Sequence, residues 1–169
     1  MKIELKKLNA LQHAVLPFSE VIDLKDEKIY GRNPFQSPVY VEGEVSNESG
    51  VLRLKGSIRT VYSTECARCL KPLDIPLEAE ADMILSDDPE AEEEDDLFVL
   101  TGDSVDPADV LVPALILQVQ MTYLCKEDCK GLCPHCGADR NVTDCDCDKK
   151  QIDPRFAALR ALLDSDKGE

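Results

Sequence analysis

The chain has 169 residues and a formal net charge of −15, from 19 basic and 34 acidic side chains. Because 43% of the residues are hydrophobic, the composition supports a core and excludes a fully disordered chain. Aromatic residues make up only 5% and tryptophan is absent, which argues against an aromatic platform for single-stranded nucleic acid. The negative charge also excludes non-specific binding of polyanions, because such a surface repels phosphate.

The amino-terminal segment 1–18 has no uninterrupted apolar stretch and no small-residue cleavage site, so no secretory signal is predicted. No stretch approaches the roughly 20 apolar residues that a membrane span needs. We therefore expect a cytoplasmic protein without a membrane partner. In that compartment, 8 cysteines favour metal binding over disulfides.

Residues 1–38 are expected to form a short strand around Ile3 and Leu5, followed by a loop-rich connection over 17–38. A β-sheet domain is predicted over 39–124. Strands at 39–45, 51–62 and 75–85 alternate apolar residues with polar ones, and an Asn-Glu-Ser-Gly turn separates the first two. The run 87–96 carries eight acidic residues and is expected to be a solvated loop, because like charges this close repel one another.

A short strand at 97–100 precedes a helix predicted at about 107–122. Asp106 is placed to cap this helix, and Pro107 suits its first position. The apolar run that follows predicts burial against the sheet, while Pro113 predicts a kink or a later start. Residues 125–169 are expected to form a zinc-binding module and a C-terminal helix. The predicted class is α+β: an antiparallel β-sheet or small partly closed β-barrel, a packed helix and a cysteine-rich C-terminal module.

The cysteines fall into four close pairs: Cys66/Cys69, Cys125/Cys129, Cys133/Cys136 and Cys145/Cys147. Close pairs can direct both sulfurs into one tetrahedral site, so four pairs predict two structural metal ions. We favour zinc over iron–sulfur clusters, and we favour joining the first pair to the second and the third to the fourth. Other groupings stay open because Cys129 and Cys133 are also close in sequence, and His135 is an alternative ligand.

The sequence shows no Ser/His/Asp constellation, no glycine-rich phosphate loop and no pattern of paired buried carboxylates. We therefore expect no enzymatic activity and no small-molecule substrate. Redox chemistry competes for the cysteines, but the thioredoxin-like βαβ pattern is missing. Metal-dependent hydrolysis is the least favoured alternative, because a site closed by four sulfurs has no open position for a substrate.

Basic residues gather between 51 and 71, where the only acid is Glu65. They are Arg53, Lys55, Arg59, Arg68 and Lys71, which we call the basic stripe. One interpretation is a solvated outer strand face whose cations also offset the zinc thiolates. The other is a nucleic-acid-binding surface that contacts backbone phosphates rather than bases.

Four motifs together resemble a known family. Cys-Ala-Arg-Cys-Leu-Lys-Pro at 66–72 is followed by Leu-Cys-Lys-Glu-Asp-Cys-Lys-Gly-Leu-Cys-Pro-His-Cys-Gly at 124–137. An Asp-Cys-Asp-Cys motif and the segment Asp-Pro-Arg-Phe-Ala-Ala-Leu-Arg-Ala-Leu-Leu close the chain. Over roughly residues 40–163 this order resembles the YceD family, the large ribosomal RNA subunit accumulation proteins of bacteria and plastids. Pro113 departs from the family's usual pattern.

The resemblance implies a non-enzymatic ribosome-biogenesis factor that supports processing or accumulation of large-subunit (23S) rRNA. The basic stripe would then contact large-subunit rRNA or a pre-ribosome. The resemblance also suggests a large-subunit ribosomal protein as partner. The alternative function is therefore an acidic, zinc-stabilised holdase or placement factor for such a basic protein. Some family members lack the block from Cys133 to Cys147, which suggests that the second metal site is accessory.

Overall fold

A computed structural model describes residues 2–9, 13–88 and 96–147 of the chain. Its main feature is a five-stranded sheet with the strand order β2-β3-β4-β5-β6. The strands are β2 (Val15–Ile22), β3 (Val39–Glu48), β4 (Val51–Glu65), β5 (Pro72–Ser86) and β6 (Leu97–Val99). Neighbours pair antiparallel except β5 and β6, which are parallel.

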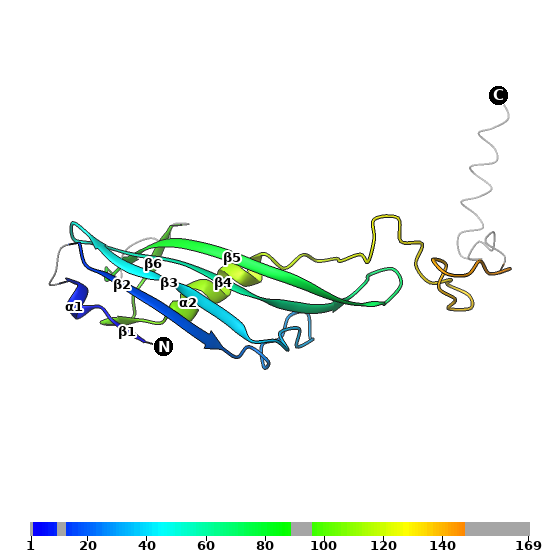
Figure 1. The fold of residues 1–169 in the computed structure, drawn as a ribbon, viewed down its shortest axis with the longest axis horizontal. Coiled ribbons are helices and arrows are strands. Elements are labelled where there is room, and N and C mark those ends of the chain that lie inside the picture. Colours follow the sequence, from blue (N-terminus) through cyan, green and yellow to red (C-terminus); the bar gives the residue numbers. More distant parts are fainter. Residues whose placement is uncertain (1, 10–12, 89–95, 148–169) are drawn as a thin grey trace, which may run out of the picture.

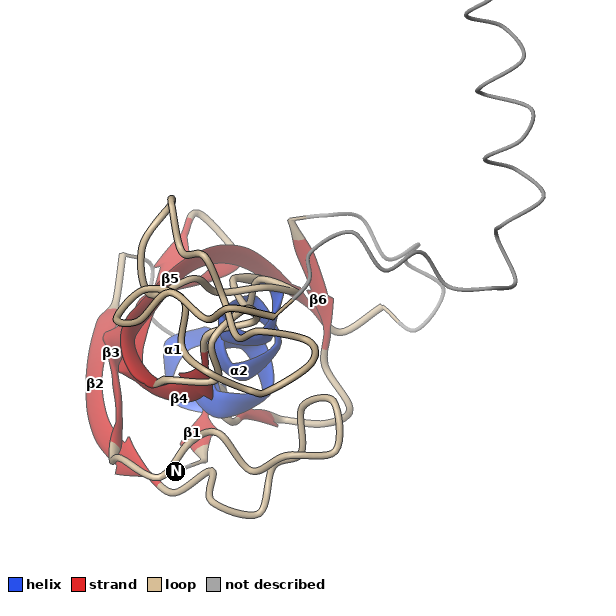
Figure 2. Cartoon of the chain, turned by 90° about the vertical axis from the view of Figure 1, so that its right-hand side faces the viewer, coloured by secondary structure: helices blue, strands red, loops and turns tan. Residues whose placement is uncertain are grey.

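A second, two-stranded sheet pairs β1 (Ile3–Glu4) with β7 (Ser104–Val105) and so joins the amino-terminal segment to the residues before the longer helix. The helices are α1 (Lys6–Asn9) and α2 (Pro107–Leu117). Figure 1 shows an elongated molecule whose chain runs from α2 along the sheet to the cysteine-rich segment at the far end. Seen from that end, the sheet curls around both helices (Figure 2). The fold is thus a mostly β, α+β-like half-barrel.

The alternation predicted for β4 separates the two faces of the sheet. Its inward residues, Leu52, Leu54, Ile58, Thr60 and Tyr62, are all buried. Leu111 and Leu115 of α2 are fully buried and pack in the same core cluster. Asp106 caps α2 by accepting a hydrogen bond from the Ala108 backbone N–H at 3.1 Å. Each buried leucine of this kind contributes roughly 1.5–3 kcal/mol, which holds α2 inside the curl.

Two glycines let the sheet pack closely against its own core. Gly43 of β3 pairs with Gly56 of β4, and a Cβ added at Gly43 would lie 2.7 Å from the Cζ of Phe18. A Cβ at Gly56 would lie 3.1 Å from the same atom and 3.2 Å from Leu111 Cδ1. The ring of Phe18 therefore occupies the space that two side chains would otherwise take.

Two predictions of local structure are wrong. The sequence predicts a loop from residue 17, but the residues up to Ile22 belong to β2. In this edge strand Val15, Leu16 and Val21 are all exposed, so the strand shows no alternating pattern. The helix expected to reach 122 ends at Leu117. The predicted C-terminal helix lies outside the described residues, as does most of the acidic run 87–96. Within the described part of the chain, no helix is long and apolar enough to cross a membrane.

Candidate functional site

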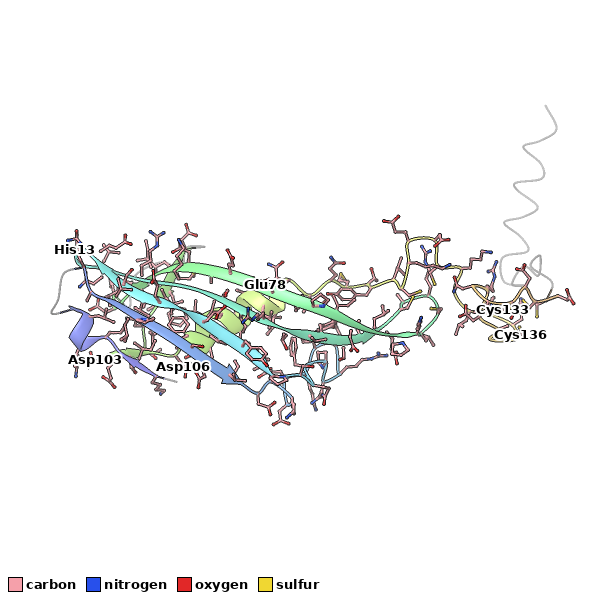
Figure 3. All side chains as sticks on the ribbon, in the orientation of Figure 1. His13, Glu78, Asp103, Asp106, Cys133 and Cys136 are labelled. Carbon is pink, nitrogen blue, oxygen red and sulfur yellow. The ribbon has the colours of Figure 1, made fainter. Side chains whose placement is uncertain are left out.

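The eight cysteines lie in two groups at one end of the molecule. Cys66, Cys69, Cys125 and Cys129 form the first group, and Cys133, Cys136, Cys145 and Cys147 form the second. In each group the four sulfurs lie within 4.8 Å of one another. The structure thus brings together the two sets that the sequence analysis favoured, and His135 belongs to neither. Figure 3 shows Cys133 and Cys136 at the opposite end from His13 and Asp103.

The first group is built where a tight turn meets the segment that follows α2. Cys66 and Cys69 lie in the turn between β4 and β5, closed by hydrogen bonds from Cys66 N to Lys71 O at 2.8 Å and from Leu70 N to Cys66 O at 3.0 Å. Leu70 adopts φ 59°, which a left-handed turn residue requires. The Ala67 backbone N–H donates to Tyr123 O at 2.9 Å. This bond fixes the second half of the group, which begins at Cys125, beside the turn.

The sulfur geometry of the first group fits a tetrahedral ion. Cys66 and Cys129 sulfurs lie 3.8 Å apart, and those of Cys69 and Cys125 lie 3.6 Å apart. A tetrahedron with Zn–S bonds of about 2.3 Å has sulfurs about 3.8 Å apart. All eight cysteines are free of disulfides. The donor set is therefore suited to a structural zinc-like ion held by four thiolates.

The pKa values within the first group indicate that its four thiols do not all ionise readily without a cation. Burial opposes ionisation of Cys66, but the backbone N–H groups of Cys125, Cys69 and Arg68 together lower its pKa to about 6. Burial and the neighbouring sulfurs raise the pKa of Cys125 to about 12. A bound divalent cation would relieve this mutual repulsion and allow all four thiols to ionise.

Polar groups beyond the four sulfurs hold Cys129 in place. The Asn141 Nδ2 donates to Cys129 Sγ at 3.4 Å, and the Asn141 Oδ1 accepts the Lys130 backbone N–H at 2.9 Å. Asn141 is itself held by Asp139, whose Oδ1 accepts the Asn141 backbone N–H at 2.8 Å. Asn141 was not predicted from the sequence. The only signal was an Asp-x-Asn spacing between two cysteine pairs, a common turn pattern.

The second group is more open than the first. Cys133 is buried, Cys145 and Cys147 are half-buried, and Cys136 is exposed. Its turn is closed by hydrogen bonds from Gly137 N to Cys133 O at 2.9 Å and from Cys133 N to Ala138 O at 2.8 Å. Gly137 has φ 73°, a conformation in which glycine is favoured. Backbone N–H groups of Cys136 and His135 lower the pKa of Cys133 to about 6.

The basic stripe falls into two parts. On the outer face of β4, Arg53 and Lys55 reach Asp82 at 2.5 and 3.4 Å. Arg59 lies 3.6 Å from Glu42. These three side chains share one strand face, as predicted, and each is paired with an acid from a neighbouring strand.

The other part of the stripe lies at the first cysteine group. The Arg68 guanidinium donates to Cys129 O at 2.9 Å, so it joins the two halves of this group. Lys71 is exposed, and its charge, with that of Lys126, helps to lower the pKa of Asp139, after the larger effect of hydrogen bonds from Asn141. Contact of either part with nucleic acid stays a prediction.

Comparison with known proteins gives a consistent assignment. Residues 54–163 match the sequence model of the family described as "Large ribosomal RNA subunit accumulation protein YceD". A Bacillus subtilis protein named YlbN is 27% identical over 98% of both chains. The maize "Large ribosomal RNA subunit accumulation protein YCED homolog 1, chloroplastic" is 28% identical over 69% of this chain. Its Arabidopsis thaliana namesake is 27% identical over 82% of this chain. The chain spans 51% of the length of each plant relative. No solved structure was found to match.

Proposed function

The chain belongs to the YceD family, and on this premise we propose that it is a non-enzymatic ribosome-biogenesis factor supporting large-subunit (23S) rRNA accumulation in the cytoplasm. The observation that carries the proposal is the family match, which covers both cysteine groups and part of the basic stripe. The names of the plant relatives describe the same role. A non-enzymatic role is supported by two groups of four sulfurs, because zinc held by four thiolates keeps no position for a substrate.

The basic stripe is the proposed rRNA contact. Exposed ion pairs contribute only about 0–1 kcal/mol each, so RNA phosphates can replace Asp82 and Glu42 as partners of the β4 cations. At the other end, Lys71 and Lys126 are exposed beside the first cysteine group. In this proposal an ion in that group fixes the turn, while Arg68 orients the two halves and Lys71 meets phosphate.

Charge reversal tests this contact. The variant Lys71→Glu with Lys126→Glu should weaken binding of a 23S rRNA fragment. For each phosphate that the variant no longer neutralises, the slope of log K against log salt should fall by about 0.7–0.9. Lys2→Glu with Lys28→Glu is the matched control, since both of these lysines are exposed and belong neither to the stripe nor to the first cysteine group. Equal affinity and equal salt slope for the two double variants would refute an RNA contact at the turn.

A second candidate function is the binding of a basic large-subunit ribosomal protein. It is supported by the outer face of the sheet, where acids outnumber the three cations of β4. On the strands that flank Lys55, Ser57 and Arg59 these acids are Glu42, Glu44, Glu78, Glu80 and Asp82. Crosslinking in cells separates the two candidates by the molecule that it recovers, rRNA or a ribosomal protein, because the β4 cations of the stripe share the outer face with these acids.

A further inference from the structure

The outer face of the sheet contains two hollows that follow each other along β4. The first, of about 650 Å³, is lined by residues that include Ser19, Glu42, Lys55, Ser57 and Glu80. The second, also about 650 Å³, is lined by residues that include Pro38, Tyr40, Arg59, Val61 and Pro76. In the strand register, Glu42 and Ser57 lie two residues from Tyr40 and Arg59. The hollows therefore follow each other along the same face of the sheet, and we call the two together the outer-face groove.

The first hollow opens outward because its inner side is filled. The ring of Phe18 lies against Gly43 and Gly56 from the core side, where a Cβ at either position would also meet the backbone of the neighbouring strand. On the outer side the groove floor is backbone and the small side chains of Ser19 and Ser57. A floor of this kind leaves room for another extended chain to lie close to the sheet.

The second hollow is apolar and has one aromatic wall. Tyr40 is 47% exposed, and the Arg59 guanidinium lies 5.7 Å from the centre of its ring. Val61 and Pro76 face each other across β4 and β5. Within the described part of the chain, no other segment covers this hollow. It can take one apolar side chain against the tyrosine ring.

The charges beside the groove form two lines of carboxylates. Glu44 and Glu42 follow β3, while Asp82, Glu80 and Glu78 follow β5. Among the described residues, no ion pair is found for Glu44, Glu78 or Glu80. Carboxylates on one face of a strand repeat about every 6.6–6.8 Å, the spacing of alternate side chains in an extended peptide. The lines thus match a chain with a cation at every second residue.

We propose that the outer-face groove binds an extended, lysine- or arginine-rich peptide segment of a protein partner, with one apolar side chain in the hollow at Tyr40. This inference deepens and rests on the second candidate function, the binding of a basic protein. From Lys55 to Val61 the groove measures about 20 Å, which an extended segment of about six residues spans. This peptide competes with the rRNA contact proposed for the β4 cations, and the carboxylates of Glu44, Glu78 and Glu80 favour the peptide because they repel phosphate.

A peptide titration tests the groove in the full chain loaded with zinc. The probe is a fluorescein-labelled peptide of about eight residues in which lysine alternates with threonine around a central leucine. The triple variant Glu44→Gln, Glu78→Gln, Glu80→Gln should raise its Kd about tenfold, since it removes three exposed pairs of about 0.5 kcal/mol each. Asp26→Asn, Glu27→Gln, Glu127→Gln makes the same charge change outside the groove, and should leave the Kd within about twofold.

The apolar hollow has its own readout. Wild type should prefer the leucine probe to one with serine at its centre, and Tyr40→Ser should abolish that preference, whereas Tyr30→Ser should keep it. Equal Kd values for the two triple variants, or an unchanged preference in Tyr40→Ser, would overturn the proposal. So would weaker binding of a 23S rRNA fragment by the groove triple variant. Deletion of the chain followed by measurement of 23S rRNA tests the proposed function separately, whatever the titration gives.

Discussion

Replacing Asn141 should selectively weaken metal binding at the first cysteine group. Its side chain donates to Cys129 Sγ and accepts from the Lys130 backbone N–H. Asn141→Ala removes both bonds, and a hydrogen bond to a charged acceptor contributes about 1.5–3 kcal/mol. Removing a hydrogen-bond partner of a metal ligand typically lowers metal affinity about 10–100-fold, or about 1.4–2.7 kcal/mol. Asn141→Asp should act in the same direction, because it keeps the acceptor but places a carboxylate against a thiolate.

Competition with a coloured zinc chelator measures this effect. Wild type should release two ions to the chelator. In Asn141→Ala, one of the two ions should be bound about 10–100-fold more weakly than in wild type. The second cysteine group is the internal control, and Asn33→Ala, which removes an exposed asparagine bound to Lys25 O, is the control variant. Alkylation followed by mass spectrometry identifies the emptied group. Two ions held as tightly as in wild type, or freed thiols that belong to the second group, would contradict this role of Asn141.

Three further predictions concern stability and access. Gly43→Ala should lower the urea midpoint without changing the slope, at a cost of about 1–3 kcal/mol, because its Cβ would meet the β4 backbone at Lys55 O and Gly56 Cα as well as Phe18 Cζ; Gly102→Ala, with open space around it, should have little effect. A hydrogen bond from Arg53 lowers the pKa of Asp82 below its usual 3.8, so its contribution to stability is present at higher pH and is lost as the pH falls through the lowered pKa. In an NMR titration, Arg53→Gln should move that pKa back upward, and an unchanged value would contradict the pairing. In metal-free protein, iodoacetamide should modify the exposed Cys136 before any buried cysteine; the reverse order by mass spectrometry would contradict the burial.

Much of the sheet could be predicted because β3, β4 and β5 each have one buried and one solvated face. Their side chains therefore alternate in sequence as they do in space. The edge strand β2 could not be predicted in this way, since Val15, Leu16 and Val21 are exposed and Pro17 is tolerated at an edge. The Asp106-Pro107 helix start was predictable because capping is local chemistry.

The end of α2 could not be predicted because it depends on contacts with residues that are distant in the sequence. Residues 118–124 are mostly apolar and predict more helix, but Tyr123 packs against Tyr62 with ring centres 5.5 Å apart, and its carbonyl accepts from Ala67. An extended segment covers about twice the length of a helical one per residue, so the chain leaves the helix to reach the turn at Cys66. The ion pairs of the stripe could not be predicted either, because Arg53 and Asp82 are 29 residues apart in sequence.

If ions fill both groups, the division of the cysteines between near and distant segments would set the order in which the ions bind. Cys66 and Cys129 are 63 residues apart, so an ion in the first group acts as a cross-link closing a loop of that size. By loop-closure entropy such a link disfavours the unfolded chain by about 4 kcal/mol. The second group closes a much shorter loop and can capture its ion while the rest of the chain is still unfolded. An ion in the first group would therefore report that β4, β5 and the segment after α2 have already come together. Loss of that ion would destabilise this assembly, whereas loss of the ion from the second group would destabilise only the local turn.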